Sequence, residues 1–221
     1  YENALQYLWE AFVLARDAAK DTANGLKASY EATHDDVADY IDKVAGYGLD
    51  VSAALDLLMR SETKKDEGDE FMRLYEQSGG DENATAAVFL LNATAAYREA
   101  VDLLNSARDT AEGVAKDEAD AQITRASGML EEAKAQPNAP EDKISEAEAK
   151  LSEAEAAYYA GDYLTAIDLA KEAYNLAKDA KETGVKRTQE ARQRMTYIAI
   201  GAGVAAAAAI AGGAYIWRRR A

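Results

Sequence analysis

The chain has a single histidine, His34, and it lies one helical turn after Glu31. This Glu-x-x-His spacing puts both side chains on one helix face, as in helical bundles that hold two metal ions. Such a centre needs a second copy of the motif, and the sequence has no other histidine. Asp35, Asp36 and Asp39 follow and could touch a cation, but their arrangement is more typical of a solvated helix face. We therefore predict no metal site.

Other catalytic chemistry lacks its characteristic residues. Cysteine is absent, which excludes thiolate nucleophiles, disulfides and cysteine metal ligands. No nucleophile elbow, glycine-rich phosphate loop or histidine-supported dyad occurs. With 40 Asp and Glu residues, no carboxylate pair stands out as a general acid and base. The sequence therefore predicts a protein that is not an enzyme and that binds no cofactor.

The charge balance is strongly acidic. The 40 acidic residues face 25 Lys and Arg residues, for a net charge of −15, although the region from Lys186 onward is basic. An acidic surface repels nucleic acid, and no basic groove with aromatic side chains compensates for it. We therefore expect no nucleic-acid partner.

Composition and periodicity indicate helix almost throughout. Alanine is the most common residue, and the only prolines are Pro137 and Pro140. Alanine is the strongest helix former and proline the strongest helix breaker. We expect an all-α fold, an elongated antiparallel bundle of helical hairpins with a C-terminal transmembrane helix.

The first 80 residues are expected to form three helices. Apolar side chains in 3–22 recur at helical spacing, and Gly25 is expected to end that helix. A second helix is expected over 26–45. The third is capped by Asp50 or Ser52 and continues to Gly79-Gly80. Its polar stretch, SETKKDEGDE, predicts either a helix surrounded by solvent or a break at Gly68.

The next helix is expected to begin at Asp81 and to reach Ala135, before the rigid Pro137–Pro140 turn. Its apolar side chains, expected to pack inward, are Val88, Phe89, Leu90, Leu91, Tyr97, Val101 and Leu104. A helix over 141–160 follows. The last helix begins at Tyr163 and is expected to continue into the membrane span, with Gly184 as its one candidate interruption.

Residues 158–173, YYAGDYLTAIDLAKEA, resemble the middle of a tetratricopeptide repeat. The matching positions are Tyr158, Gly161, Asp162, Tyr163, Ala166, Ile167 and Ala173. Leu151 stands at the large-residue position of the preceding helix, whereas Glu155 replaces the glycine of the motif. The resemblance covers about one repeat and implies two antiparallel helices packed through Ala and Tyr. A peptide-binding groove would require several stacked repeats.

Two N-glycosylation sequons lie close together and begin at Asn83 and Asn92. Asn83 follows Gly79-Gly80 at an expected helix start, where an acceptor would be accessible. Asn92 lies between Leu91 and Tyr97 and is expected to be partly buried. We therefore expect Asn83 to be the modified residue if the protein is glycosylated.

The C-terminal segment 197–217 contains 21 residues without a charge. As a helix it would measure about 30 Å, the thickness of the hydrocarbon core of a bilayer. Tyr197 stands at one end and Trp217 at the other, and the arginines 218–220 follow directly. Aromatic and basic residues favour the two membrane interfaces. This pattern predicts a single-pass membrane protein.

Small residues recur four positions apart within this segment, which would let two helices approach closely. The pairs are Gly201 with Ala205, Ala208 with Gly212, and Ala209 with Gly213. An alanine-rich anchor that packs against no other helix explains the same pattern equally well.

These features predict five parts. They are an N-terminal helical bundle (1–80), a long helix with the repeat-like hairpin (81–184), a basic juxtamembrane segment (185–196), the transmembrane helix (197–217) and a short basic tail (218–221).

Basic residues flank both sides of the span, so the positive-inside rule leaves its orientation open. A chain that begins at Tyr1 fits a mature product without its signal peptide, and equally a trimmed chain. The absence of an initiator Met, the two sequons and the absence of cysteine together favour an extracellular N-terminal part and a cytoplasmic C-terminus. The expected partners are the lipid bilayer and other proteins, or a second copy of the chain.

The layout of an acidic helical ectodomain, an Ala/Gly-rich span and a terminal arginine cluster is similar to that of single-span archaeal cell-surface proteins. Some of these anchor a surface layer (S-layer) as stalks. The Pro-Gly-Phe sorting signal of many such proteins is absent. The resemblance implies a structural or interaction protein at the cell surface. Three alternatives stay open: an extracellular sensor or ligand-binding bundle, a tail-anchored cytosolic adaptor, and an anchor subunit of a larger membrane complex.

Overall fold

The computed structural model describes the backbone of residues 2–80 and 84–220, and the side chains of 3–80, 85–198 and 200. The described backbone is helical apart from short connections and contains no strand, which confirms the predicted all-α class. Contacts divide the chain into two compact units, residues 1–117 and 118–221.

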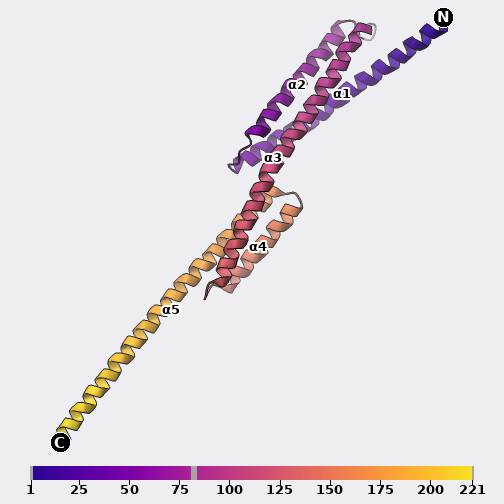
Figure 1. Cartoon of the computed structure of the whole chain (residues 1–221). Helices are drawn as coiled ribbons and strands as arrows, with labels where there is room; N and C mark the ends of the chain where they lie inside the picture. The colour runs from indigo at the N-terminus through magenta and orange to yellow at the C-terminus, as the bar shows by residue number, and fades with distance from the viewer. Residues whose placement is uncertain (1, 81–83, 221) are drawn as a thin grey trace. The chain divides into compact units, whose positions relative to one another are not determined.

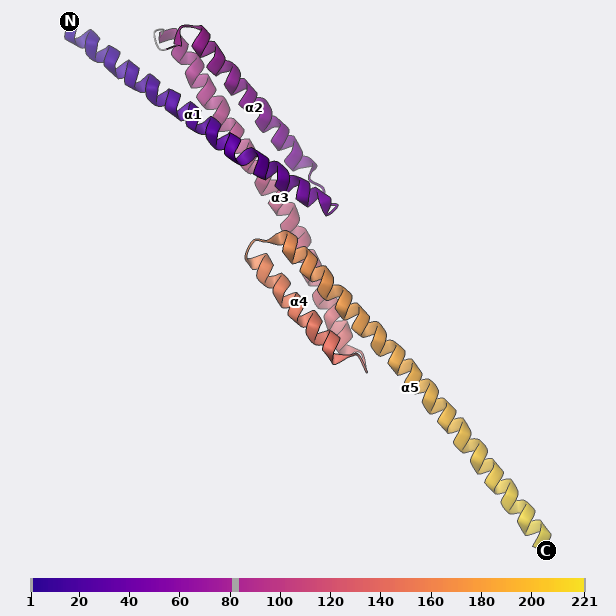
Figure 2. The ribbon, with the colours of Figure 1, turned by 180° about the vertical axis from the view of Figure 1, so that it is seen from behind.

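Three helices form the first unit. They are α1 (Glu2–Gly46), α2 (Ser52–Gln77) and the first part of α3 (Ala87–Ala135), which follows a short 3-10 helix, η2 (Ala84–Ala86). Within this unit α1, α2 and α3 lie side by side (Figures 1 and 2). The predicted boundary at residue 80 lies in the connection between α2 and α3, inside this unit.

Helix α1 is continuous, so the prediction that Gly25 ends the first helix is wrong. Glycine inside a helix costs about 1 kcal/mol relative to alanine, which packing can offset. The side chains before and after Gly25 lie on one buried face, since Ala23 and Tyr30 are both buried. The expected end at Gly46 is confirmed, and Gly48 beyond it has a φ of 78°, a backbone conformation that favours glycine.

The core of the first unit mixes large and small side chains. Its fully buried members include Ile41 and Val44 of α1 and Leu90, Tyr97 and Leu104 of α3. Burying one large aliphatic side chain contributes roughly 1.5–3 kcal/mol.

Two of the residues expected to pack inward do not. Val88 and Leu91 of α3 are exposed by 55% and 61%. Because successive residues are about 100° apart around a helix, Val88 points nearly opposite to the buried Leu90 and Leu91 points well to one side of it. The helix itself begins at Ala87, later than the expected Asp81, and ends at Ala135 as predicted.

The second unit is a three-helix arrangement with an alanine core. It contains the end of α3, α4 (Glu141–Tyr159) and α5 (Tyr163–Arg220), and α4 lies beside the first part of α5 in Figure 2. Ten buried side chains form one cluster: Ala126, Leu130, Ala133, Ala147, Leu151, Ala154, Ala170, Ala173, Ala177 and Ala180. Because each buried methyl contributes only about 0.8 kcal/mol, this core depends on close contact along the whole length of the helices.

Helix α5 runs unbroken through Gly184 to Arg220, which confirms the predicted continuous helix. Gly184 is a packing position. A Cβ added there would lie 2.8 Å from Cγ of Gln136 and 2.9 Å from the backbone nitrogen of Ala139. The missing side chain therefore lets α5 contact the turn between α3 and α4.

The predicted membrane segment lies largely outside the described side chains, which near the C-terminus end at residue 200. The same holds for the small-residue pairs Gly201/Ala205, Ala208/Gly212 and Ala209/Gly213. In the part of the chain that the structure describes, no helix has both the length and the apolar character needed to cross a membrane.

Candidate functional site

The most chemically diverse surface of the first unit lies between α1 and α2. An open pocket of ≈ 470 Å³ there is lined by Tyr30, Glu31, His34, Asp35, Glu62, Lys65 and Asp66. Four of these seven side chains are carboxylates, and His34 is the only histidine of the chain. Helix α1 supplies four of the residues and α2 supplies three.

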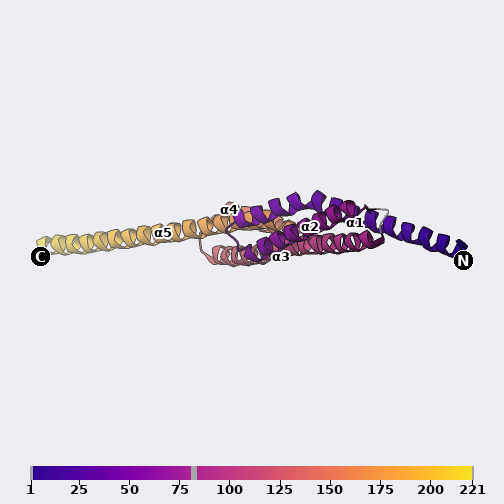
Figure 3. The same ribbon diagram turned by 90° about the horizontal axis from the view of Figure 1, so that it is seen from above.

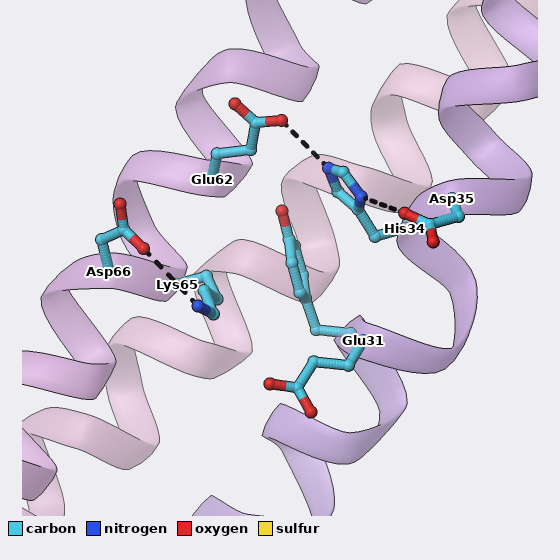
Figure 4. A pocket seen from close by; sticks show the side chains of 7 residues that line it. Glu31, His34, Asp35, Glu62, Lys65 and Asp66 are labelled. Atoms are coloured by element: carbon cyan, nitrogen blue, oxygen red, sulfur yellow. Dashed lines mark hydrogen bonds and ion pairs between the residues drawn. The ribbon is translucent and has the colours of Figure 1, made fainter.

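His34 connects the two helices. Its Nε2 lies 3.0 Å from Oε1 of Glu62, and its Nδ1 lies 3.1 Å from Oδ1 of Asp35. Figure 4 shows the two carboxylates on either side of the imidazole ring. Burial lowers the pKa of His34, but the hydrogen bonds to Asp35 and Glu62 outweigh it and raise this pKa above 6.5. Since carboxylates only accept hydrogen bonds, this geometry suits the doubly protonated ring.

Below the pocket, a buried hydroxyl pair joins the same helices. The Tyr30 hydroxyl lies 3.2 Å from Oγ of Ser61, and Ser61 is fully buried. Ser61 Oγ donates its proton to the carbonyl oxygen of Leu58 at 2.7 Å. The Tyr30 hydroxyl must therefore be the donor in the pair, because a serine hydroxyl has only one proton. Burial raises the pKa of Tyr30 further above 10, so this donor stays protonated.

One helical turn further along α2, Asp69 joins all three helices. Its carboxylate accepts hydrogen bonds of 2.7 Å from Nζ of Lys27 on α1, from Nζ of Lys65 on α2 and from the hydroxyl of Tyr97 on α3. Burial raises the pKa of Asp69, but these three donors outweigh burial and lower it from 3.8 to about 2. The carboxylate is therefore charged and fully engaged at neutral pH.

The neighbouring glycine makes this arrangement possible. A Cβ on Gly68 would lie 2.5 Å from Cε1 of the Tyr97 ring, closer than real Cβ contacts allow. Tyr97 thus crosses directly over the α2 backbone to reach Asp69, and burial together with the Asp69 hydrogen bond raises the pKa of its hydroxyl. We call the residues Lys27, Tyr30, Ser61, Lys65, Asp69 and Tyr97 the polar seam.

The polar groups of the seam are paired with one another. Among the residues that the structure describes, every buried side-chain nitrogen and oxygen atom has a hydrogen-bond partner, and no cluster of three or more His, Asp or Glu could hold a metal ion. Glu31 lies 3.9 Å from Nζ of Lys27, and in Figure 4 its carboxylate points away from the His34 ring. Chemically, the arrangement fixes how three helices pack.

Sequence reasoning missed the polar seam because the run SETKKDEGDE looked solvated on every side. Helix α2 neither breaks at Gly68 nor lies free in solvent there. The available signal was the spacing of small residues. Ser61 and Gly68 are seven residues apart, and both lie on the buried face that also carries Leu58 and Tyr75. Each small residue faces a tyrosine, Tyr30 or Tyr97.

In the repeat-like hairpin of the second unit, α4 and α5 are joined by the turn at Gly161 and Asp162. Gly161 has a φ of 83°, and the Tyr158 and Tyr163 rings meet with centroids 5.5 Å apart. The side chain of Asp162 accepts a hydrogen bond of 3.2 Å from the backbone nitrogen of Thr165, which caps α5. Ala166 is fully buried.

The two sequons have different outcomes. Asn83 lies outside the described residues. The prediction that Asn92 is partly buried is wrong, because its side chain on α3 is exposed. Thr94 of the same sequon is half-buried, and its hydroxyl donates a 2.9 Å hydrogen bond to the carbonyl oxygen of Leu90.

Comparison of the chain with protein-family models, curated proteins and solved structures finds no match.

Proposed function

We propose that the protein is a non-catalytic, single-pass membrane protein whose helical N-terminal part acts as a structural or interaction element at the cell surface. The observation that carries this proposal is the uncharged segment 197–217 followed by three arginines. Its backbone belongs to α5, which also contributes to the core of the second unit. A helix of this composition and length matches the hydrocarbon core of a bilayer.

The polar chemistry of the first unit supports a role without catalysis. Asp69, the most strongly perturbed carboxylate, is saturated by three donors, and His34 is held between two carboxylates. A general base or nucleophile needs a partly free, accessible group poised to react. In these helices the charges instead join one helix to the next, which suits a scaffold that holds its own shape.

Membrane flotation of the full chain tests the anchor. Ala207, at the centre of the segment, is replaced by Asp, and the matched control carries Asp at the exposed Ala191. An acidic residue at the centre of a membrane helix costs about 2.5–3.5 kcal/mol, whereas one outside the span costs little. We expect only Ala207→Asp, or deletion of 197–221, to shift protein from the vesicle fraction to the soluble fraction. Equal flotation of all variants would refute the anchor.

Protease treatment of intact cells separates the cell-surface role from the tail-anchored cytosolic alternative. If the N-terminal part is outside, added protease removes residues before the span while a cytoplasmic marker protein survives. Complete protection of the N-terminal part, with digestion only after the cells are opened, would favour the cytosolic adaptor.

A further inference from the structure

The N-terminal part of α1 extends beyond the helices that it packs against, and it carries large apolar side chains there. Figure 3 shows this end of α1 running past α2 and α3 of its own unit. Leu5 and Leu8 are each exposed by 68%, and Trp9 is exposed by 52%. Isolated surface leucines are common, but a continuous apolar stripe on one helix indicates a missing neighbour.

This stripe continues the buried face of α1. Apolar residues recur along the helix at steps of three and four, with one step of seven between Tyr30 and Val37, which keeps them on one side. From Leu5 the series is Leu5, Leu8, Phe12, Ala15, Ala19, Ala23, Leu26, Tyr30, Val37, Ile41 and Val44. Residues from Ala19 onward contact α2 and α3 or are buried by them. Leu5 and Leu8 use the same face beyond the reach of α2 and α3, whereas the half-buried Phe12 lies at the edge, where it lines a pocket together with residues of α3.

The exposed part of the stripe carries almost no charge. Residues 3–15 contain a single charged residue, Glu10, in a chain in which 29% are charged. Glu10 accepts a 3.0 Å hydrogen bond from the side chain of Gln6, on the face opposite Leu5 and Phe12. The exposed turns at Leu5 and Leu8 therefore suit another apolar helix, and the next charge along α1, the buried Arg16, is paired with Asp17 at 2.7 Å.

An apolar pocket lies next to the stripe. It has a volume of ≈ 180 Å³ and is lined by Phe12, Ala15, Arg16 and Ala19 of α1 and by Ala87, Leu90 and Leu91 of α3. A dry cavity of about 150 Å³ is large enough for an aromatic ring. The same surface therefore presents protruding side chains at Leu8 and Trp9 and, about two turns later, a hollow able to receive them.

We propose that this surface pairs two copies of the chain, with their α1 helices antiparallel about a two-fold axis near Ala11. A two-fold interface uses the same patch on both copies, so the patch must be complementary to itself. Antiparallel pairing places Leu8 and Trp9 of each copy over the pocket of the other. Parallel pairing would set protrusion against protrusion and hollow against hollow.

The available surface is sufficient. A specific interface needs about 1,000 Å² of buried surface in total. Each large aromatic side chain can bury roughly 150–250 Å². Two copies of the stripe, with the exposed Leu91 that lines each pocket, supply area of that order. The inference goes beyond the proposed function and does not depend on the membrane anchor.

The chain allows a direct test because it contains no cysteine. Ala4, Ala11 and Ala18 are one heptad apart, exposed, and on one flank of the stripe. Each is replaced by Cys in a separate variant of the full chain. The variants are purified in mild detergent and treated with a short bifunctional maleimide. Antiparallel pairing predicts that Ala11→Cys dimerises with itself and that Ala4→Cys joins Ala18→Cys when the two proteins are mixed. Ala4→Cys alone stays monomeric, since two copies of that position lie about 21 Å apart along the helices.

A disrupting substitution supplies the control. Leu8→Lys in the Ala11→Cys protein should reduce cross-linking at least tenfold. The matched control is Met59→Lys, a substitution at another exposed apolar residue, on α2, and it should leave cross-linking unchanged. Hydrogen exchange verifies that both variants keep their helices. The proposal would be overturned if Ala11→Cys formed no dimer, if all three positions cross-linked to themselves, or if Leu8→Lys left cross-linking unaffected. Capture of a different protein in cell membranes would overturn it too.

Discussion

Replacing Gly68 by alanine should destabilise the first unit, although the same substitution usually stabilises a helix. Alanine is favoured over glycine in a helix interior by about 1 kcal/mol. At Gly68, however, the added methyl would lie 2.5 Å from the Tyr97 ring. Relieving such overpacking costs about 1–3 kcal/mol in a well-packed interior.

A second loss follows if the ring moves. The Tyr97 hydroxyl donates to the charged Asp69 at 2.7 Å, and hydrogen bonds to charged groups contribute about 1.5–3 kcal/mol. With both losses, and after the gain in helix propensity is subtracted, we expect Gly68→Ala to lower the stability of the first unit by about 1.5–5 kcal/mol.

The matched control is Gly25→Ala in the same unit. No atom lies within 4 Å of a Cβ built on Gly25, so the substitution should gain about 1 kcal/mol. Native-state hydrogen exchange, read on peptides from α1 and α2, measures the opening free energy of this unit separately from the rest of the chain. The two alanine variants should shift it in opposite directions.

The Tyr97→Phe variant separates the two losses. It removes the hydrogen bond but keeps the ring. If the methyl of Gly68→Ala already breaks this bond, the double variant should lose less stability than the sum of the two single losses. Stabilisation by Gly68→Ala, equal to that of Gly25→Ala, would refute the close crossing of Tyr97 over α2.

Two further predictions concern pH and the hairpin. The pKa of Asp69 is lowered to about 2, so its contribution to folding stability is present above pH 3.8 and is lost as the pH falls from 3.8 to about 2. The pKa of His34 is raised, so its contribution to folding stability is present below pH 6.5 and is lost as the pH rises through the folded-state pKa. The melting temperature of His34→Gln should therefore lie below that of the wild type at about pH 5 and match it at about pH 9, whereas Asp69→Asn should differ from the wild type at both; a constant gap for His34→Gln would contradict the shift. In the second unit, Ala166→Phe should cost about 1–3 kcal/mol by overpacking a fully buried position, while Asp168→Ala at an exposed position should change stability by less than about 0.5 kcal/mol. Circular dichroism melts that coincide for these two variants would mean that the hairpin is not packed as described.

The sequence predicted most helices because local signals control where they end. The glycines at 46 and 48, the two prolines and Gly161 all stand at helix ends or in the turns between helices. Gly25 and Gly184 show the limit of this reasoning. Gly184 allows close contact with the α3–α4 turn and Gly25 faces open space, yet both look in sequence like a glycine that ends a helix. Tertiary packing decides between these outcomes.

The polar seam was not predictable from charge alone. Lys65 and Asp69 read as ordinary surface residues four apart, and nothing local shows that Lys27 and Tyr97 would reach the same carboxylate. That convergence depends on the register of three helices, which is a property of long-range packing. The turn between α4 and α5 was easier to predict from the sequence because its signals lie within a short segment.

The alanine core of the second unit has a thermodynamic consequence. The heat capacity of unfolding rises with the apolar area that becomes exposed, and an alanine side chain exposes only one methyl. Eight of the ten residues in the main buried cluster of this unit are alanines. Its heat-capacity change per residue should therefore be below the usual value of about 12–15 cal/mol/K. A small heat-capacity change flattens the curve of stability against temperature, so this unit should keep a nearly constant margin of stability in cold and warm surroundings alike.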